Sequence, residues 1–334
     1  MINSHERRLG SSALTLGSMG LGVAPLGNLY ASVSDADADA TLAAAERCNF
    51  SWFDVAPLYG YGLAEERLGR FLKEPGHASR IVATKVGRVL EPASSAQPHE
   101  HFVSPLPYRP QFDYSRAGIE RSYDESLRRL GVDRVQILLL HDVDRLHHPS
   151  RHRTVVKQLL DEALPTLHRL KADGRVDAIG LGIGECDIGY ELLASTEIDC
   201  VLLAGRYTLL DQSAFSSGFL DACARRDVGV LAGGVFNSGF LSGGSTYDYR
   251  PATEALVKRR HRLSALCDRH GVPLAAAALQ FTAAHPAIVS IVVGARSASE
   301  VEAIRRWKQF RIPAELWGAL RESDLIPSDA PIAD

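Results

Sequence analysis

The sequence predicts an α/β fold of the (β/α)8 TIM-barrel type, in which eight parallel strands alternate with helices. Eight short apolar runs are spread along the 334 residues, and amphipathic stretches lie between them. Continuous apolar runs are typical of strands covered on both faces, and strict alternation of strands with helices indicates a parallel sheet with its helices outside. Barrels often reach this length as one domain. We therefore expect a single domain over residues 1–334, with its core at about residues 9–317.

The expected elements follow one another in a regular order. The strands are short and mostly apolar, at residues 15–21, 51–54, 81–85, 135–140, 178–182, 199–203, 229–232 and 288–293. The helices are amphipathic, at residues 35–48, 64–72, 115–130, 154–171, 188–195, 215–226, 251–269, 273–284 and 297–307. Ser34 and Asp35 are typical of a helix start, and Gly131 after Arg128 and Arg129 is typical of a helix end.

Three further segments are expected to close or line the barrel. A turn at residues 10–12, within 7–14, indicates a small N-terminal hairpin that closes the bottom of the barrel. The long segments 91–113 and 233–250 each follow a strand, so we expect them at the C-terminal face, where barrel sites are built. Loops of this length are usually functional. We interpret both as walls of a substrate site; a mobile surface loop is the alternative for the first.

Composition excludes several classes of protein. The chain is 46% hydrophobic and 23% charged, as expected for a globular protein with a large core. A net charge of -3 gives no reason to expect nucleic acid or an anionic membrane as partner, and no apolar run is long enough to cross a bilayer. The polar N-terminus is not a secretory signal, and five cysteines without a CxxC pair favour a reducing compartment. We expect a cytoplasmic protein; its oligomeric state cannot be predicted.

Several of the twelve histidines are close together in the sequence, which raises the question of a metal site. His147, His148 and His152 form one group, and His99 and His101 form another. Neither group has the i, i+4 spacing with acidic support that a helical metal site needs. We therefore interpret them as solvated loop histidines and predict no metal.

Four residues with proton-transfer chemistry lie at or just beyond the ends of expected strands. Asp54, Lys85 and His141 end or follow strands, and Tyr59 comes five residues after Asp54. In a parallel barrel the strand ends converge on one face, so groups distant in sequence meet around one cavity. A phenol, an ammonium, a carboxylate and an imidazole form a proton-transfer site centred on Tyr59.

Each of the four also has an ordinary structural interpretation. Asp54 could cap a helix, Lys85 could reach solvent, and His141 could be a hydrogen-bonded core histidine. Tyr59 could be a loop aromatic, and Tyr61 competes with it, but the spacing from Asp54 favours Tyr59. The combination in this order favours a site over four separate structural roles.

A glycine-rich run near the N-terminus superficially resembles a dinucleotide-binding fingerprint. Gly20 and Gly22 follow a strand, but Pro25 stands at the third position and residues 26–30 continue as a loop. The fingerprint requires a helix N-terminus there to hold a pyrophosphate. The Rossmann interpretation is therefore rejected, and the run 180–184 is interpreted as close backbone packing beside a ligand.

Over residues 9–317 the chain resembles the aldo-keto reductase superfamily. The motifs that carry the resemblance are Phe53-Asp54-Val55-Ala56-Pro57-Leu58-Tyr59-Gly60, Thr84-Lys85-Val86-Gly87, Ser126-Leu127-Arg128-Arg129-Leu130-Gly131, Leu140-His141-Asp142, Ile179-Gly180-Leu181-Gly182 and Val293-Gly294-Ala295-Arg296. Residues 25–30, 56–60 and 203–212 look like the branch that contains L-fucose dehydrogenase, D-threo-aldose 1-dehydrogenase and pyridoxal 4-dehydrogenase.

The resemblance implies hydride transfer between a nicotinamide cofactor and a carbonyl carbon or its alcohol. Tyr59 would give or accept the matching proton, Lys85 would lower the pKa of Tyr59, and Asp54 would orient Lys85. His141 would donate a hydrogen bond to the substrate oxygen.

The cofactor contacts depart from the family pattern. Residues 182–185 replace a common Ser-Asn pair, Ala204 replaces a glutamine, and Gly233 replaces a stacking tyrosine. The cofactor-binding residues that we expect, with Tyr207 as a further candidate, are Gly22, Gly182, Arg206, Phe236, Gly294, Arg296 and Glu300. Glu300 stands where relatives that bind the 2′-phosphate carry a basic residue, which favours NAD over NADP. Arg296 could still contact phosphate.

We therefore predict an NAD(P)-dependent dehydrogenase that acts on a small molecule. The first candidate reaction is oxidation of an aldose of the L-fucose or D-threo-aldose type at C1, which gives a lactone. The alternatives are oxidation of pyridoxal to 4-pyridoxolactone, for which Phe102, Phe236 or Tyr247 would supply an aromatic wall, and general aldehyde or ketone reduction. A cofactor-binding sensor without turnover is the rival from another class, and it predicts a damaged set of the four residues.

Overall fold

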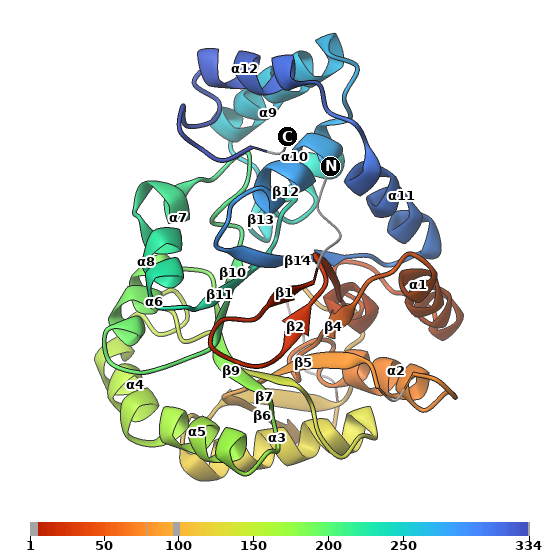
Figure 1. Ribbon diagram of the computed structural model, residues 1–334. Coiled ribbons are helices and arrows are strands. Elements are labelled where there is room, and N and C mark those ends of the chain that lie inside the picture. The colour runs from red at the N-terminus through yellow and green to blue at the C-terminus, as the bar shows by residue number, and fades with distance from the viewer. Residues whose placement is uncertain (1–5, 78, 96–100, 333–334) are drawn as a thin grey trace.

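Eight parallel strands close into a barrel in the computed structural model, which describes residues 6–77, 79–95 and 101–332 (Figure 1). The strands of the barrel are β3 (Met19–Gly22), β4 (Trp52–Asp54), β5 (Ile81–Val86), β8 (Ile137–His141), β9 (Ala178–Ile183), β10 (Cys200–Ala204), β11 (Gly229–Gly233) and β14 (Ile288–Gly294). They follow chain order around the barrel, and β14 pairs with β3 to close it. The predicted fold class is confirmed.

The strand expected at 15–21 is wrong as one element. Residues Thr15–Leu16 form β2, which pairs antiparallel with β1 (Arg7–Arg8), and the barrel strand begins only at Met19. Gly17 separates the two and packs so closely against Ser51 that an added Cβ would lie 2.7 Å from the serine Oγ. The chain therefore leaves the hairpin and enters the barrel at this glycine.

The expected N-terminal hairpin is present and lies across one end of the barrel (Figure 1). Leu9 and Leu16 are fully buried in the same apolar cluster as Trp52, Ile137 and Leu231, which lie on barrel strands. The hairpin thus covers the interior of the barrel with two leucines.

Helices surround the barrel on the outside (Figure 1). The α-helices are α1 (Asp35–Arg47), α2 (Leu63–Leu72), α3 (Arg116–Leu130), α4 (His152–Gln158), α5 (Leu164–Ala172), α6 (Cys186–Leu193), α7 (Ser213–Ser216), α8 (Phe219–Arg225), α9 (Glu254–Arg269), α10 (Leu274–Ala283), α11 (Ala298–Gln309) and α12 (Ala314–Glu322). The 3₁₀ helices are η1 (Ala24–Gly27) and η3 (Phe240–Ser242), and η2 (Leu159–Ala163) is a π-helix. No helix in the described part of the chain is both long and apolar enough to cross a membrane.

Three helical segments differ from expectation. The helix expected at 154–171 contains η2 just before Pro165, whose missing N–H interrupts the α-helical hydrogen bonds. The helix expected at 215–226 is divided at Gly218, which has a φ of 75°. Helix α12 was not predicted; it buries Trp317, and burial continues to Ala330, beyond the expected core boundary.

Each of the two long segments after a strand contains a small antiparallel ladder. In the first, β6 (Arg88–Pro92) pairs with β7 (Tyr108–Phe112), and in the second, β12 (Thr246–Tyr247) pairs with β13 (Arg250–Pro251). The loop after β3 is joined to the first segment by a bridge between Leu29 and Phe102. The described part of the first segment is therefore attached to the rim of the barrel.

A polar chain inside the bottom of the barrel links β4 and β14 to the connection between β2 and β3. The indole Nε1 of Trp52 donates to Oγ of Ser290 at 2.9 Å, and that hydroxyl donates to the carbonyl of Gly17 at 2.8 Å. Trp52 and Ser290 are both almost fully buried. The Oγ of Ser18 is also buried, but it has no partner among the described residues.

We predict that Ser290→Ala lowers the free energy of unfolding by about 1–3 kcal/mol, because it leaves the indole N–H buried without an acceptor. The matched control is Ser18→Ala, which removes a hydroxyl that has no partner and should change the free energy by less than about 0.5 kcal/mol. Urea denaturation followed by circular dichroism measures both values. Equal effects of the two substitutions would show that the Trp52–Ser290 hydrogen bond contributes nothing.

Candidate active site

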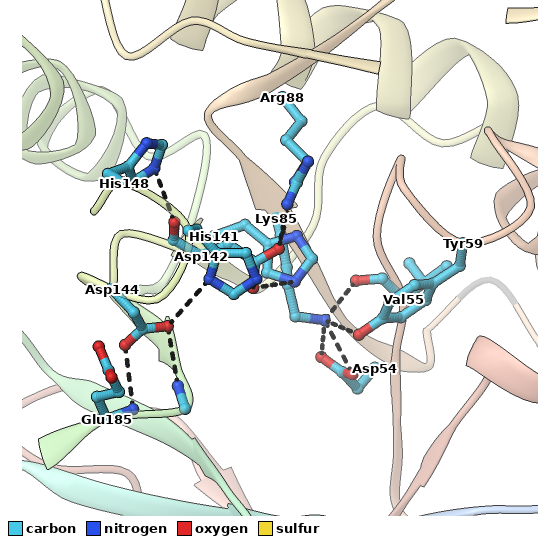
Figure 2. Close-up of polar contacts among 12 residues, drawn as sticks. Asp54, Val55, Tyr59, Lys85, Arg88, His141, Asp142, Asp144, His148 and Glu185 are labelled. Carbon is cyan, nitrogen blue, oxygen red and sulfur yellow. Dashed lines mark hydrogen bonds and ion pairs between the residues drawn. The ribbon is translucent and has the colours of Figure 1, made fainter. Parts of the chain in front are cut away.

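The ammonium of Lys85 is the centre of a buried polar cluster at the mouth of the barrel (Figure 2). Its Nζ lies 2.8 and 2.9 Å from the two carboxylate oxygens of Asp54, 2.9 Å from the carbonyl of Val55 and 3.0 Å from the hydroxyl of Tyr59. Only 1% of the lysine side chain is exposed. The structure thus brings together three of the four predicted residues through one charged group.

Strand register explains why these side chains meet. Asp54 ends β4 and is level with Ala83 of β5, two residues before Lys85. His141 ends β8, next to β5, and is paired with Gly182 of β9. All of these strands are parallel, so their carboxyl ends lie on one face.

Tyr59 reaches the cluster from a tight turn after β4. Its N–H donates to the carbonyl of Ala56 at 3.0 Å, and Gly60 after it has a φ of 62°. Gly27 packs against this turn, where an added Cβ would lie 2.6 Å from the carbonyl carbon of Tyr59. The close approach of Gly27 fixes the backbone that carries the phenol.

The electrostatics of Tyr59 differ from the sequence prediction. Burial, followed by the negative charges of Asp54 and Asp142, raises the pKa of the phenol well above its ordinary value of 10.0, and Arg88 only partly opposes this. The expected net lowering of this pKa is therefore wrong, because desolvation of the buried phenol is the largest effect. Burial also raises the pKa of Asp54, against the opposing effect of Lys85. Tyr59 is consequently protonated at neutral pH.

His141 stands edge-on to Tyr59, with 6.1 Å between the ring centroids. Burial lowers the pKa of His141 to about 3, although Asp142 acts in the opposite direction. The imidazole is therefore neutral at neutral pH. Its Nε2 lies 3.5 Å from Oδ1 of Asp142, and its Nδ1 is buried without a partner among the described residues.

Asp142 and Arg88 belong to this site but were not identified from the sequence. Arg88 donates to Oδ2 of Asp142 from Nε at 3.2 Å and from Nη2 at 2.7 Å, and its guanidinium lies 3.9 Å from the ring centroid of Phe112. Burial opposes ionisation of Asp142, but His141 and Arg88 outweigh it and lower its pKa. Asp142 is the last residue of the motif Leu140-His141-Asp142, and Arg88 directly follows the motif that ends at Gly87. The two residues are 54 positions apart in the sequence, so no local sequence pattern predicts their contact.

The loop after His141 is held by buried polar groups. The hydroxyl of Tyr114 donates to the carbonyl of His141 at 2.8 Å and lies 3.0 Å from the carbonyl of Asp142. The Nε2 of His148 also lies 3.0 Å from the carbonyl of Asp142. The prediction of solvated histidines is wrong for His148 and His152, which are buried. His99 lies outside the described residues.

A group of three residues in this loop has the geometry of a weak metal site. Asp142, Asp144 and His147 each offer one atom within 4.8 Å of the others. Both carboxylate oxygens of Asp144, however, accept backbone N–H groups, from Gly184 and Glu185 at 3.1 Å each. The carboxylate of Asp144 therefore has a structural partner at both oxygens, and we propose no metal here.

Glycines at the strand ends leave room beside the cluster. A Cβ added to Gly182 would lie 3.5 Å from Cδ of Lys85 and 3.7 Å from Cδ2 of His141, so the bare Cα of Gly182 faces both side chains. Gly22 is paired with Asp54 on one side and with Gly294 on the other. Of these glycines, Gly182 faces Lys85 and His141, whereas a Cβ on Gly22 would lie 3.2 Å from Val292 and one on Gly294 would lie 3.0 Å from Pro25. A flat ring such as nicotinamide would contact bare backbone at Gly182.

Two predicted cofactor contacts are occupied by protein partners. The guanidinium of Arg206 pairs with Asp211 at 2.9 Å and with Asp248, which joins the loops after β10 and β11. Phe236 packs edge-on against Trp307 of α11, with 5.6 Å between centroids. Their roles in cofactor binding stay predictions.

Arg296 and Glu300 lie together at the N-terminus of α11. Oε2 of Glu300 accepts the backbone N–H of Arg296, and Oε1 pairs with its Nε, both at 2.9 Å. Ser297 caps the same helix by accepting from the N–H of Glu300. The first turn of α11, after the end of β14, therefore carries a carboxylate close to its positive end.

Of the three predicted aromatic wall residues, Phe102 is the one that lies beside Tyr59. Their ring centroids are 6.2 Å apart. Phe236 packs on Trp307, and Tyr247 packs edge-on to Phe240 at 6.4 Å. Phe102 comes from the first long segment, as expected for a substrate wall.

Comparison with known proteins identifies relatives over nearly the whole chain. The aldo/keto reductase family model matches residues 18–324. Pyridoxal 4-dehydrogenase of Microbacterium luteolum is 40% identical over 97% of this chain and 98% of its own, and D-threo-aldose 1-dehydrogenase of a Pseudomonas species is 36% identical over 98% and 100%. An aldo-keto reductase from Bacillus halodurans, solved in its holo form, has the same fold with a TM-score of 0.76, 22% identity and coverage of 99% of both chains.

We predict that Lys85→Met lowers the free energy of unfolding by about 3–5 kcal/mol, because Asp54 is left buried without its partner. Combining it with Asp54→Asn should restore about 1–3 kcal/mol, since the uncompensated charge is then removed. Lys258→Met is the control. It breaks an exposed pair with Glu254, and the expected cost is below about 0.5 kcal/mol. Urea denaturation measures the parent, both single variants, the double variant and the control, and additive single effects would contradict the coupling.

Proposed function

This chain belongs to the aldo/keto reductase family, and from that premise we propose that it oxidises the hemiacetal carbon of an aldose to a lactone. Membership makes it an NAD(P)-dependent oxidoreductase that acts on alcohol or carbonyl groups. The observation that carries the proposal is the phenol of Tyr59, 3.0 Å from the buried ammonium of Lys85 and edge-on to neutral His141. An acid–base group positioned in this way can exchange a proton with a substrate oxygen.

The nicotinamide, when bound, accepts or supplies the hydride. Gly22, Gly182 and Gly294 would border it, as their bare backbone allows. Tyr59 accepts the proton of the hemiacetal hydroxyl during oxidation and returns it during reduction. Lys85 stabilises the phenolate, which is the form that accepts the proton in oxidation and is left after proton donation in reduction, and Asp54 holds the ammonium in place. Neutral His141 donates a hydrogen bond to the reacting oxygen and orients it.

NAD is the cofactor that we favour. Glu300 and Arg296 pair at the start of α11. The guanidinium that could contact a 2′-phosphate therefore already has a carboxylate beside it. A carboxylate repels a 2′-phosphate and can accept hydrogen bonds from a free ribose hydroxyl pair. The carboxylate of Glu300 supports NAD over NADP.

Pyridoxal is the second candidate substrate, and one observation favours it. Phe102 is buried beside Tyr59 and can cover a flat pyridine ring. The Microbacterium relative, 40% identical, bears the name pyridoxal 4-dehydrogenase. Oxidation of the cyclic hemiacetal of pyridoxal to its lactone uses the same proton and hydride transfer.

The test is a side-by-side measurement of kcat/KM on L-fucose, D-arabinose and pyridoxal, each with NAD and with NADP. Production of NADH with the sugars supports the first candidate, and production with pyridoxal alone supports the second. Reduction of simple aldehydes without oxidation of any hemiacetal would replace both with a general reductase. No turnover in either direction would revive the non-catalytic sensor.

We predict that Tyr59→Phe lowers kcat for oxidation by about 10²–10⁴-fold, because the proton acceptor is lost. The fold should be retained, since Lys85 keeps its contacts with Asp54 and Val55. Tyr61→Phe is the control that separates the two candidate tyrosines, and its kcat should stay within about threefold of the parent. Full turnover of Tyr59→Phe would refute the assigned role.

The pH dependence of the two directions should differ. Oxidation needs the phenolate of Tyr59, and burial raises its pKa above 10.0. Below that pKa the phenolate fraction grows about tenfold per pH unit, so kcat/KM for oxidation should rise steeply between about pH 7 and about pH 9. Reduction needs the phenol and should stay level over the same range. Initial rates in both directions measure this, and a level profile for oxidation would contradict it.

A further inference from the structure

We propose that Asp142, held in place by Arg88, binds the substrate hydroxyl nearest to the reacting carbon and thereby selects hydroxylated substrates. This inference rests on the proposed function, whose substrates both carry such a group. In an aldose it is the hydroxyl on C2, the carbon bonded directly to the reacting carbon, and in pyridoxal it is the ring hydroxyl, one ring carbon further away. The shared chemistry is a hydroxyl that donates to a carboxylate.

The two oxygens of Asp142 have different surroundings (Figure 2). Oδ2 accepts two hydrogen bonds from Arg88, at 3.2 and 2.7 Å. Oδ1 lies 3.5 Å from Nε2 of His141 and 3.8 Å from Nε2 of His147, longer than a good hydrogen bond. One oxygen is therefore saturated, and the other retains capacity to accept.

The backbone places this oxygen at the mouth of the barrel and holds it there. Asp142 has a φ of 54°, a left-handed conformation that aspartate tolerates better than most residues. Its N–H donates to the carbonyl of Gly182 at 3.0 Å, and Tyr114 and His148 contact its own carbonyl. The side chain of Asp142 is 17% exposed. Such preorganisation lowers the cost of ordering the site when substrate binds.

Arg88 acts as a positioning residue in this arrangement. Its side chain is only 12% exposed, and its guanidinium lies over the ring of Phe112. Its Nε and Nη2 both donate to Oδ2 of Asp142. The guanidinium keeps the neighbouring carboxylate ionised, and an ionised carboxylate is an acceptor only. Oδ1 can therefore bind a hydroxyl as donor, and it has no proton to offer to the reacting oxygen.

Asp142 and His141 together match two nearby oxygens, which sit on adjacent carbons in an aldose and on carbons separated by one ring carbon in pyridoxal. Neutral His141 is assigned to the reacting oxygen, and Oδ1 of Asp142 lies 3.5 Å from its Nε2, within reach of the next hydroxyl along the substrate. A site built to hydrogen-bond a hydroxyl disfavours an analogue that lacks it, because the polar group is then left without a partner. Selection for the neighbouring hydroxyl follows from this pair.

The first test compares matched substrates on the unaltered protein. D-Arabinose is paired with its 2-deoxy form, and pyridoxal is paired with the analogue that lacks the ring hydroxyl. We expect kcat/KM to be about 10–100-fold higher for the hydroxylated member of the pair that this chain oxidises, as a charge-assisted hydrogen bond implies. The pair that shows turnover identifies the source of the hydroxyl. Equal values within the oxidised pair overturn the proposal.

The second test uses Asp142→Asn, which keeps the size of the side chain and tolerates the left-handed backbone. The preference should fall to within about threefold, because the amide cannot replace the ionised acceptor. This ratio cancels any change in Tyr59, whose pKa Asp142 also raises. An unchanged ratio overturns the proposal. Thermal melting confirms folding, and if the variant does not fold, the comparison on the unaltered protein decides the matter.

Asp144→Asn is the matched control in the same loop. Asp144 is buried and binds the backbone N–H groups of Gly184 and Glu185. Its substitution should lower activity on both members of a pair alike and leave their ratio unchanged. If Asp142→Asn behaves in the same way, its role is structural and the proposal is wrong. If the unaltered protein oxidises neither these four compounds nor L-fucose, the proposed function itself is wrong and this inference falls with it.

Discussion

Burial of one ammonium, that of Lys85, is the constraint on which the rest of the site depends. A charge removed from water in this way is tolerated only when its donors are satisfied, and here two carboxylate oxygens, a carbonyl and a phenol lie within 3.0 Å. Each partner comes from β4 or the turn after it. The need to satisfy the lysine therefore fixes the distance between β5 and the turn that carries Tyr59.

The closed barrel is what makes this arrangement possible. β3, β4, β5, β8 and β9 are neighbours in the sheet and end on one face, so residues 54, 85, 141 and 182 converge without any contact between their local sequences. The hairpin formed by β1 and β2 covers the opposite end with Leu9 and Leu16. One end of the barrel is thus packed with apolar side chains, and the other end carries the polar residues of the candidate active site.

The surroundings of Lys85 also control the protonation of the neighbouring titratable side chains. Burial keeps His141 neutral and Tyr59 protonated, while Arg88 holds Asp142 as an ion. The neutral imidazole and the fixed carboxylate are only 3.5 Å apart. A donor and an acceptor at that spacing suit a substrate with a hydroxyl close to the reacting oxygen, which is the feature that aldoses and pyridoxal share. This common feature explains why the four central residues alone do not separate the two substrates.

The sequence by itself determined the barrel, seven of its strands with the end of the first, and the convergence of Asp54, Tyr59, Lys85 and His141. Apolar periodicity and the placement of polar residues at strand ends are local patterns, and parallel topology turns them into positions in space. Only the tertiary structure decided the raised pKa of Tyr59, the pairing of Asp142 with Arg88, the burial of His148 and the break after β2. Desolvation and contacts between distant segments control these features. Neither leaves a periodic or motif-like trace along the chain.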